Sequence, residues 1–264
     1  MYAFDFHRPD TVRKAATLLG KAEDPKLLAG GQTLLPTMKQ RLAAPANLVD
    51  LSQVEGLDAI ELKGRTLHIG AMARHVSVAN SDTVREAIPA LAALAGGIGD
   101  PHVRNMGTIG GSLANNDPAA DYPAAALALD ATIVTNRRKI PADEFFQGMF
   151  TTALEEDEII TKVMVPIPRK AAYQKFDNPA SRYALVGVFV AKRSSEVRVA
   201  VTGAGQDGVF RATALEDALK ARFAPKSLDG VTMPADDLNA DIHAGADYRA
   251  HLITVMARRA VAAA

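Results

Sequence analysis

The sequence predicts a protein that mixes α-helices with β-strands and that divides into two domains near residue 168. Three observations lead to this prediction. Apolar residues recur at helical spacing in several segments, and short apolar runs next to glycine or proline are typical of buried strands. The composition changes at residues 168–172, after which two runs typical of strands follow. A chain of 264 residues is also long enough for two modest domains.

Helices and strands alternate along most of the chain. The first expected helix begins after Pro9, places Ala15 and Leu19 on one face and ends at Gly20. Further helices are expected at residues 34–42, 84–95, 118–129, 212–221 and 248–263. Strands are expected at residues 26–29, 47–51, 66–71, 131–135, 159–167, 183–192 and 197–202. A glycine-rich stretch, residues 96–111, interrupts this alternation.

Charge and composition exclude several classes of protein. Thirty basic residues balance thirty acidic ones, so the chain lacks the basic excess that favours nucleic-acid binding. The absence of cysteine excludes a disulfide, a Cys-ligated zinc site and a Cys-ligated iron–sulfur cluster within this chain. No apolar run approaches the roughly 20 residues of a membrane span, and residues 1–9 do not resemble a secretory signal. We therefore expect a soluble cytoplasmic protein with no integral membrane segment and no nucleic-acid partner.

Two glycine-rich segments carry the functional prediction. The first, residues 28–36, reads LAGGQTLLP, and the second, residues 104–114, reads RNMGTIGGSLA. Without a Cβ, the main chain of glycine can adopt positive φ and approach a ligand closely, and successive N–H groups can then face one anion. Two such turns can hold a diphosphate from both sides, helped by hydroxyl groups of their threonine and serine side chains. The carboxylate of Asp121, which follows the second segment, suits sugar hydroxyls instead.

The sequence gives little support for other kinds of functional site. Neither glycine segment is a Rossmann fingerprint or a P-loop, and both could also be ordinary tight turns, although two in one domain make that alternative weaker. The six histidines lack metal-ligand spacing and no serine has a local base, so we expect neither a metal site nor a catalytic residue. The acidic run Glu155–Glu158 is interpreted as a solvated turn before a strand.

Together the two glycine segments resemble the paired FAD motifs in the medium subunits of molybdenum hydroxylases, the carbon monoxide dehydrogenase and xanthine dehydrogenase family. In that family the first motif is typically AGG(H/Q)(S/T)LLP, and the second is RNx(A/G)TIGG(S/N) ending in PxxD. Both occur here in the family's order. The resemblance continues at Tyr173, Lys175 and Phe176, at residues 181–188 and in the last helix, so it covers essentially the whole chain. One departure is Gln32, where several members have histidine.

The resemblance implies an α+β fold with FAD as its cofactor. Residues 1–168 are expected to form a FAD-binding domain of the vanillyl-alcohol oxidase (PCMH) type, with subdomains at about 1–55 and 56–168 and the flavin between them. Residues 169–264 are expected to form a small C-terminal α+β domain of the carbon monoxide dehydrogenase flavoprotein type. The cofactor-binding residues so implied are Ala29, Gly30, Gly31, Gln32, Thr33, Leu34, Thr108, Ile109, Gly110, Gly111, Ser112, Asp121, Lys175 and Tyr183.

The function implied by the resemblance is electron transfer. Electrons would reach FAD from the [2Fe-2S] clusters of a small partner subunit and leave to an external acceptor. A large molybdopterin-containing subunit would oxidise the substrate, in a heterotrimer that forms dimers. Two alternatives remain open: a nucleotide-binding scaffold or regulatory subunit without flavin, and a stand-alone FAD-dependent oxidase.

Overall fold

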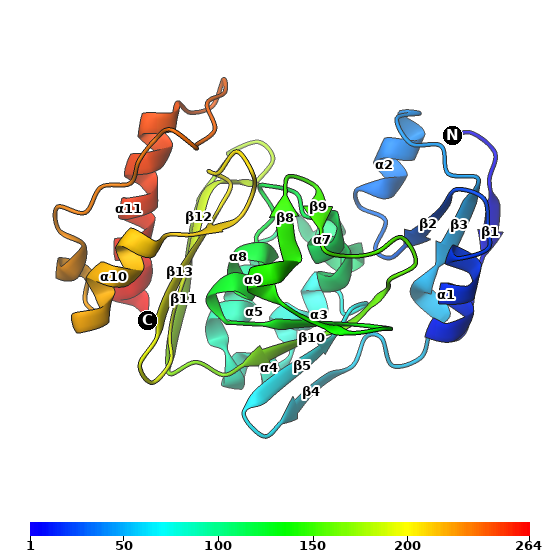
Figure 1. Cartoon of the computed structure of the whole chain (residues 1–264), viewed down its shortest axis with the longest axis horizontal. Coiled ribbons are helices and arrows are strands. Elements are labelled where there is room, and N and C mark those ends of the chain that lie inside the picture. The colour runs from blue at the N-terminus through cyan, green and yellow to red at the C-terminus, as the bar shows by residue number, and fades with distance from the viewer.

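The structure, a computed structural model, describes all 264 residues of the chain. Its three main sheets follow one another along the long axis of the molecule in the order of the sequence (Figure 1). A three-stranded sheet lies at the N-terminal end, a five-stranded sheet occupies the centre, and a four-stranded sheet lies next to the C-terminal helix. A two-stranded hairpin lies beside the central helices.

The N-terminal sheet is parallel, with the strand order β1-β3-β2. Its elements are β1 (Asp5–His7), α1 (Val12–Leu19), β2 (Pro25–Leu28), α2 (Leu34–Lys39), β3 (Asn47–Asp50) and the 3-10 helix η1 (Leu51–Gln53). The Thr11 hydroxyl accepts a hydrogen bond from the N–H of Lys14 and caps α1, which packs on β3 through Ala15. Helix α2 begins directly after the first glycine segment and ends earlier than predicted.

The central sheet is antiparallel, with the strand order β4-β5-β10-β6-β7. Its strands are β4 (Ile60–Lys63), β5 (Thr66–Gly70), β6 (Thr132–Thr135), β7 (Lys139–Pro141) and β10 (Ile160–Pro166). Between β5 and β6 run the helices α3 (His75–Asn80), α4 (Asp82–Ala87), α5 (Pro89–Gly96), α6 (Pro101–Met106), α7 (Ile109–Asn115) and α8 (Tyr122–Ala128). After β7 come α9 (Ala142–Phe145) and the hairpin strands β8 (Phe146–Gly148) and β9 (Thr151–Thr152).

The prediction of one continuous helix at residues 84–95 is wrong, because the chain forms α4 and α5 there. Ile88 leaves the helical region with φ −143° and ψ 77°, and Pro89 opens α5. Proline lacks an N–H and suits the first turn of a helix rather than its interior. The glycine-rich stretch is also more regular than its composition indicated, since it contains α6, capped by Asp100, and the start of α7, capped by Thr108.

The third sheet is antiparallel, with the strand order β11-β12-β13-β14. Its elements are β11 (Lys170–Asp177), β12 (Ala184–Lys192), β13 (Val197–Thr202) and β14 (Phe210–Arg211), followed by α10 (Thr213–Ala221), η2 (Pro225–Leu228) and α11 (Ala246–Ala263). Strand β12 is buried on both faces: Val188 and Val190 pack against α10 and α11, whereas Phe189 points into the central core. None of the helices is both long and apolar enough to cross a lipid bilayer.

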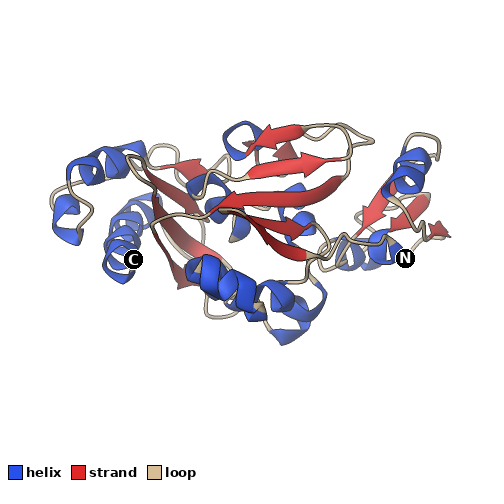
Figure 2. Ribbon diagram, turned by 90° about the horizontal axis from the view of Figure 1, so that it is seen from below, coloured by secondary structure: helices blue, strands red, loops and turns tan.

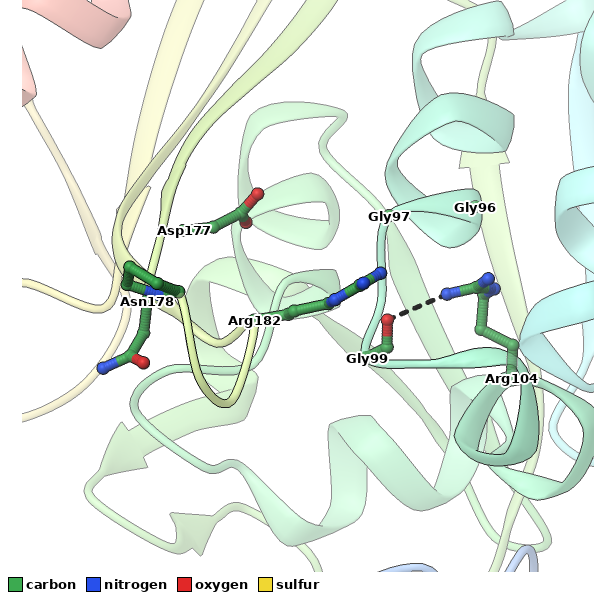
Figure 3. Close-up of a pocket in the computed structure, with 8 residues that line it drawn as sticks. Gly96, Gly97, Gly99, Arg104, Asp177, Asn178 and Arg182 are labelled. Atoms are coloured by element: carbon green, nitrogen blue, oxygen red, sulfur yellow. Dashed lines mark hydrogen bonds between the residues drawn. The ribbon is translucent and has the colours of Figure 1, made fainter.

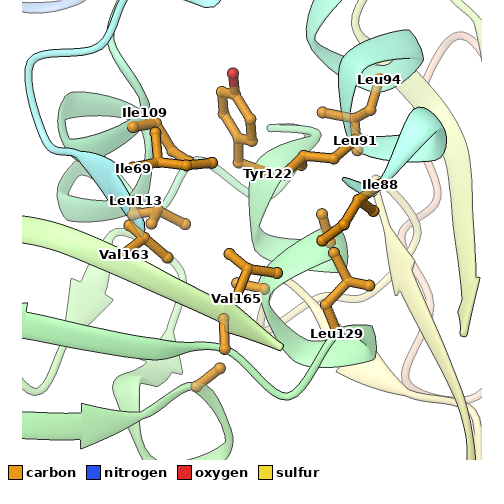
Figure 4. Close-up of a cluster of buried hydrophobic side chains, with 14 of the residues drawn as sticks. Ile69, Ile88, Leu91, Leu94, Ile109, Leu113, Tyr122, Leu129, Val163 and Val165 are labelled. Atoms are coloured by element: carbon orange, nitrogen blue, oxygen red, sulfur yellow. The ribbon is translucent and has the colours of Figure 1, made fainter. Parts of the chain in front are cut away.

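The largest core joins the central sheet to the four-stranded sheet. Val163 and Val165 of β10 lie close to Leu91 of α5 and Tyr122 of α8 in this core (Figure 4). Phe189 of β12 belongs to the same core. The central sheet itself lies between the N-terminal sheet and the four-stranded sheet (Figure 2). Packing on both sides of α8 therefore fixes the loop that precedes it, residues 116–121.

The acidic run Glu155–Glu158 is only partly solvated. The Glu158 side chain is fully buried, and it accepts hydrogen bonds from the Arg138 guanidinium at 2.9 Å and from the Thr135 hydroxyl at 2.7 Å. The bonds from Arg138 and then Thr135 hold the pKa of Glu158 at about 2, below its ordinary value of 4.5. This ion pair, between the buried carboxylate of Glu158 and the partly exposed guanidinium of Arg138, holds the β6–β7 hairpin against the segment before β10.

We expect Glu158→Gln to lower the free energy of unfolding by about 2 kcal/mol at neutral pH, because the neutral amide cannot form the charge-assisted hydrogen bonds that the carboxylate makes with Arg138. Folding lowers the pKa of Glu158, so its stabilising contribution is complete above the unfolded pKa of about 4.5 and is lost as the pH falls toward about 2. Denaturant unfolding of both proteins, from neutral pH into the acid range, measures this difference. Glu156→Gln, at an exposed carboxylate without an ion pair, is the control. A difference that stays constant in acid would contradict the assignment.

Candidate cofactor site

The first glycine segment forms an open turn between β2 and α2. Gly31 adopts a φ of 71°, a conformation that glycine accommodates without strain. The main-chain N–H groups of residues 30–34 donate no hydrogen bond within the chain, although Gly30 is buried. Gln32 and Thr33 are exposed, so a ligand can reach this run of free donors, and successive N–H groups in such a turn can bind an anion such as a diphosphate.

The second glycine segment forms the first turn of α7. The Thr108 hydroxyl oxygen accepts a hydrogen bond from the N–H of Gly111 at 3.1 Å and caps the helix. The N–H groups of Ile109 and Gly110 donate to carbonyl groups just after β5, at 3.1 and 2.8 Å. The expectation of free main-chain donors in both turns is therefore wrong for these residues. The hydroxyl groups of Thr108 and Ser112 remain as donors on this side.

The two glycine segments touch through their main chains. A Cβ placed on Gly30 would lie 2.2 Å from the carbonyl oxygen of Met106 and 2.7 Å from the Cα of Gly107. A Cβ on Gly111 would lie 3.5 Å from the Cβ of Ala29. Only glycine at position 30 allows this approach. The prediction that the two segments lie side by side is confirmed.

A second group of predicted residues surrounds Asp121, directly before α8. Its carboxylate is 5% exposed, accepts a hydrogen bond from the Tyr173 hydroxyl at 2.6 Å and lies 3.1 Å from Lys175 Nζ. Burial raises the pKa of Asp121, whereas Lys175 and Tyr173 favour its charged form. Tyr183 is half exposed, and burial followed by the charges of Asp117 and Asp121 raises its pKa. No hydrogen bond or ion pair joins this group to the two glycine turns.

A polar pocket adjoins the Asp121 group (Figure 3). Its volume is about 320 Å³, within the range of small-molecule sites. The pocket is lined by Gly96, Gly97, Gly99, Arg104, Asp177, Asn178, Pro179 and Arg182. Figure 3 shows Arg182 extending from the β11–β12 loop toward Gly97, with Arg104 beyond Gly99. The Lys175 ammonium donates hydrogen bonds to the carbonyl groups of Gly97 and Arg182, at 3.0 and 3.1 Å. Lys175 therefore connects the lining of the pocket to Asp121.

Sequence reasoning missed two supporting residues of this region. Tyr173 lies two positions before Lys175 on one strand, and alternation along a strand would have placed both on the same face. His75 supports the second glycine turn, because its N–H donates to the carbonyl of Gly107 at 2.9 Å and its ring lies against Gly107. Burial, and then the nearby Arg104, lower the pKa of His75 to about 4, so the ring is neutral at physiological pH. No sequence pattern indicated the role of His75.

Sequence reasoning also overlooked residues 203–208, GAGQDG, which have the spacing of a dinucleotide fingerprint and follow strand β13. The segment leads into the short strand β14 rather than into a helix. A phosphate would therefore meet no helix N-terminus there, which is what the fingerprint needs. The segment is a turn of the C-terminal sheet.

Comparison with known proteins identifies the family of this chain. A family model described as the FAD binding domain in molybdopterin dehydrogenase matches residues 2–168. The chain belongs to this family. It is 36% identical over 281 residues to the carbon monoxide dehydrogenase medium chain of Hydrogenophaga pseudoflava, which covers 99% of this chain and 96% of that one. It is 37% identical over 273 residues to the nicotine 6-hydroxylase medium subunit of Paenarthrobacter nicotinovorans, with coverages of 98% and 96%.

A solved structure agrees with these relatives. The carbon monoxide dehydrogenase from Hydrogenophaga pseudoflava that lacks the Mo-pyranopterin moiety matches with a TM-score of 0.89 and 36% identity, over 100% of this chain and 97% of that one. The chain is thus an FAD-binding medium subunit of the molybdenum hydroxylase family, and it is an oxidoreductase subunit. The free N–H groups of residues 30–34, in a turn where Gly31 adopts φ 71°, fit the diphosphate of FAD.

We expect Gly30→Ala to lower the free energy of unfolding by about 2 kcal/mol and to reduce FAD content, because the added methyl group forces the two glycine turns apart. Thermal unfolding and the flavin-to-protein absorbance ratio measure the two effects. Gly245→Ala is the control, since Gly245 has φ −73° and open space around its Cβ position. Full flavin content in Gly30→Ala would show that the contact between the turns is not needed for the cofactor.

Proposed function

We propose that this chain binds one FAD between its two glycine turns and transfers electrons through it within a molybdenum hydroxylase. The observation that carries the proposal is the contact of Gly30 with Met106 and Gly107, beside five consecutive main-chain N–H groups without partners. Bound FAD supplies the redox chemistry, while the protein binds, orients and shields it.

The proposed layout of the site has two halves. Residues Ala29–Leu34 and Thr108–Ser112 hold the diphosphate and the ribityl region. Asp121 accepts hydrogen bonds from sugar hydroxyls. Lys175 and Tyr183 lie near the isoalloxazine ring, which we assign to the side of the polar pocket because Lys175 bonds to its wall at Gly97.

The proposed domain division follows the three sheets. Residues 1–55 and 56–168 are proposed as the two subdomains of a vanillyl-alcohol oxidase (PCMH) type FAD domain, with the flavin between them. Residues 169–264 are proposed as the C-terminal domain. The separate N-terminal sheet and the contact between the two glycine turns at its boundary support this division.

The proposed partners are a large molybdopterin-containing subunit and a small [2Fe-2S] subunit, in a heterotrimer that forms dimers. The chain has no cysteine to bind an iron–sulfur cluster, so the clusters proposed as electron donors lie on another chain. Relatives named as medium chains and medium subunits, aligned over nearly their full lengths, support this assembly. The cytoplasmic location remains a prediction.

A purified protein with one FAD per chain, whose flavin is reduced by substrate in the complete complex, is the expected result. A colourless protein that FAD cannot reconstitute would favour a scaffold that has lost the cofactor. Substrate oxidation by this chain and FAD alone would favour a stand-alone oxidase. Absorption spectra before and after substrate addition, with and without the partner subunits, distinguish the three.

We expect Gly31→Val to lose most of its bound FAD. Gly31 has φ 71°, and a Cβ there would lie 2.9 Å from Leu35 Cδ1, so valine would turn the free N–H groups away from the diphosphate. The FAD dissociation constant measures the effect, which should be about 10-fold or more. Gly64→Val is the matched control: Gly64 has φ 61° in the β4–β5 turn and nothing near its Cβ position. Equal FAD affinity in both variants would refute the placement.

Valine at Gly110 is a less specific probe. A Cβ there would lie 2.6 Å from the Cβ and 2.7 Å from the carbonyl oxygen of Ala71, and Gly110 also donates its N–H to that carbonyl. Such a change would push α7 off the central sheet. Loss of flavin in Gly110→Val would therefore combine cofactor and folding defects.

A further inference from the structure

One row of residues crosses the inner face of the C-terminal sheet and meets the loop that carries Asp121. Lys175 of β11 pairs with Gly187 of β12, which pairs with Thr202 of β13. Tyr173 is two residues from Lys175 and therefore shares its face. The Thr202 hydroxyl lies 2.6 Å from the carbonyl oxygen of Ala120, directly before Asp121.

The Asp121 carboxylate is held by only one of its two oxygens. The Tyr173 hydroxyl donates to Oδ1 at 2.6 Å, and Lys175 Nζ lies 3.1 Å from the same atom. The second oxygen, Oδ2, accepts no hydrogen bond within the chain and is not sealed from solvent. An oriented carboxylate with one free oxygen is an acceptor prepared for a hydroxyl group.

Gly187 provides the space that the Tyr173 hydroxyl occupies. A Cβ at Gly187 would lie 2.3 Å from Tyr173 Oη and 2.8 Å from Thr202 Cγ2. Gly187 has no positive φ, so the main chain does not require glycine there. Glycine in the middle of a buried strand costs stability, and the position of the tyrosine hydroxyl gives it a physical reason.

We propose that Tyr173 is a positioning residue of the cofactor site, which aims the free oxygen of Asp121 at the ribityl hydroxyls of FAD, and that Gly187 admits its hydroxyl. The inference rests on the proposed function and extends it to the C-terminal sheet. Tyr173 acts through Asp121 and does not itself need to contact the flavin.

Tyr173→Phe tests the proposal, because it removes the hydroxyl and leaves the ring stacked on Phe189, where the centroids are 6.0 Å apart. We expect the FAD dissociation constant of the full-length chain to rise about 10-fold, in line with the loss of a hydrogen bond to a charged group. The affinity for ADP, which has the diphosphate but no ribityl group, should not change. Tyr248→Phe is the matched control, since this half-exposed tyrosine makes no hydrogen bond through its hydroxyl.

Gly187→Ala tests the same contact from the neighbouring strand. The added methyl group displaces the Tyr173 hydroxyl, so we expect a similar loss of FAD affinity with the affinity for ADP retained. The Tyr173→Phe/Gly187→Ala double variant should bind FAD about as well as either single variant, because both remove one contact. Additive losses would overturn the assignment of Gly187.

Three outcomes separate this inference from the function on which it rests. Failure of the unaltered chain to bind FAD would refute the proposed function. FAD binding by Tyr173→Phe with unaltered affinity would overturn the role of Tyr173 alone. Equal weakening of FAD and ADP would show that Tyr173 is a general structural residue rather than a positioning residue for the ribityl end.

Discussion

Gly30 lies against the carbonyl oxygen of Met106 and the Cα of Gly107, and this contact between bare main chains sets the geometry of the proposed cofactor site. The N-terminal sheet and the central sheet are separate, so their relative position at the site depends on how closely these turns approach. In the same turn, the main-chain N–H groups of residues 30–34 have no partner within the chain. The lack of a Cβ at Gly30 allows the close packing, and the positive φ of Gly31 shapes the turn that carries the free donors.

The two turns contribute in different ways to this surface. In the first turn the main chain is free to bind a ligand, whereas in the second the N–H groups of Ile109 and Gly110 anchor α7 to the end of β5. The second turn is thus a rigid wall that offers hydroxyl groups, and His75 supports it at Gly107. The first turn of α7 is held in place before a ligand binds, and it lies next to the unpaired donors of residues 30–34. Such pre-organisation reduces the entropy lost on binding.

The C-terminal sheet contributes buried charge to the other half of the site. Taking a carboxylate such as Asp121 out of water costs several kcal/mol, and the Lys175 ammonium and the Tyr173 hydroxyl offset this cost. Relatives whose names concern carbon monoxide and nicotine are about equally similar to this chain, at 36% and 37% identity. This similarity is what we expect if the medium subunit serves the flavin and a different subunit recognises the substrate.

The sequence by itself determined the two glycine turns and most of the helices and strands, and its resemblance to a known family indicated the cofactor. Glycine clusters, helical spacing and short apolar runs are local signals, which depend on neighbours in the chain. The break at Pro89 was equally local, although it was not predicted. Strand β11 was not predicted, because buried polar side chains such as that of Lys175 interrupt the apolar alternation of the strand. Only the tertiary structure decided which N–H groups of the glycine turns are free, because their partners at Ala71 and Ala73 lie far away in the sequence. It also decided that Tyr173 and Gly187 support Asp121, since pairing between strands joins residues that no local pattern connects.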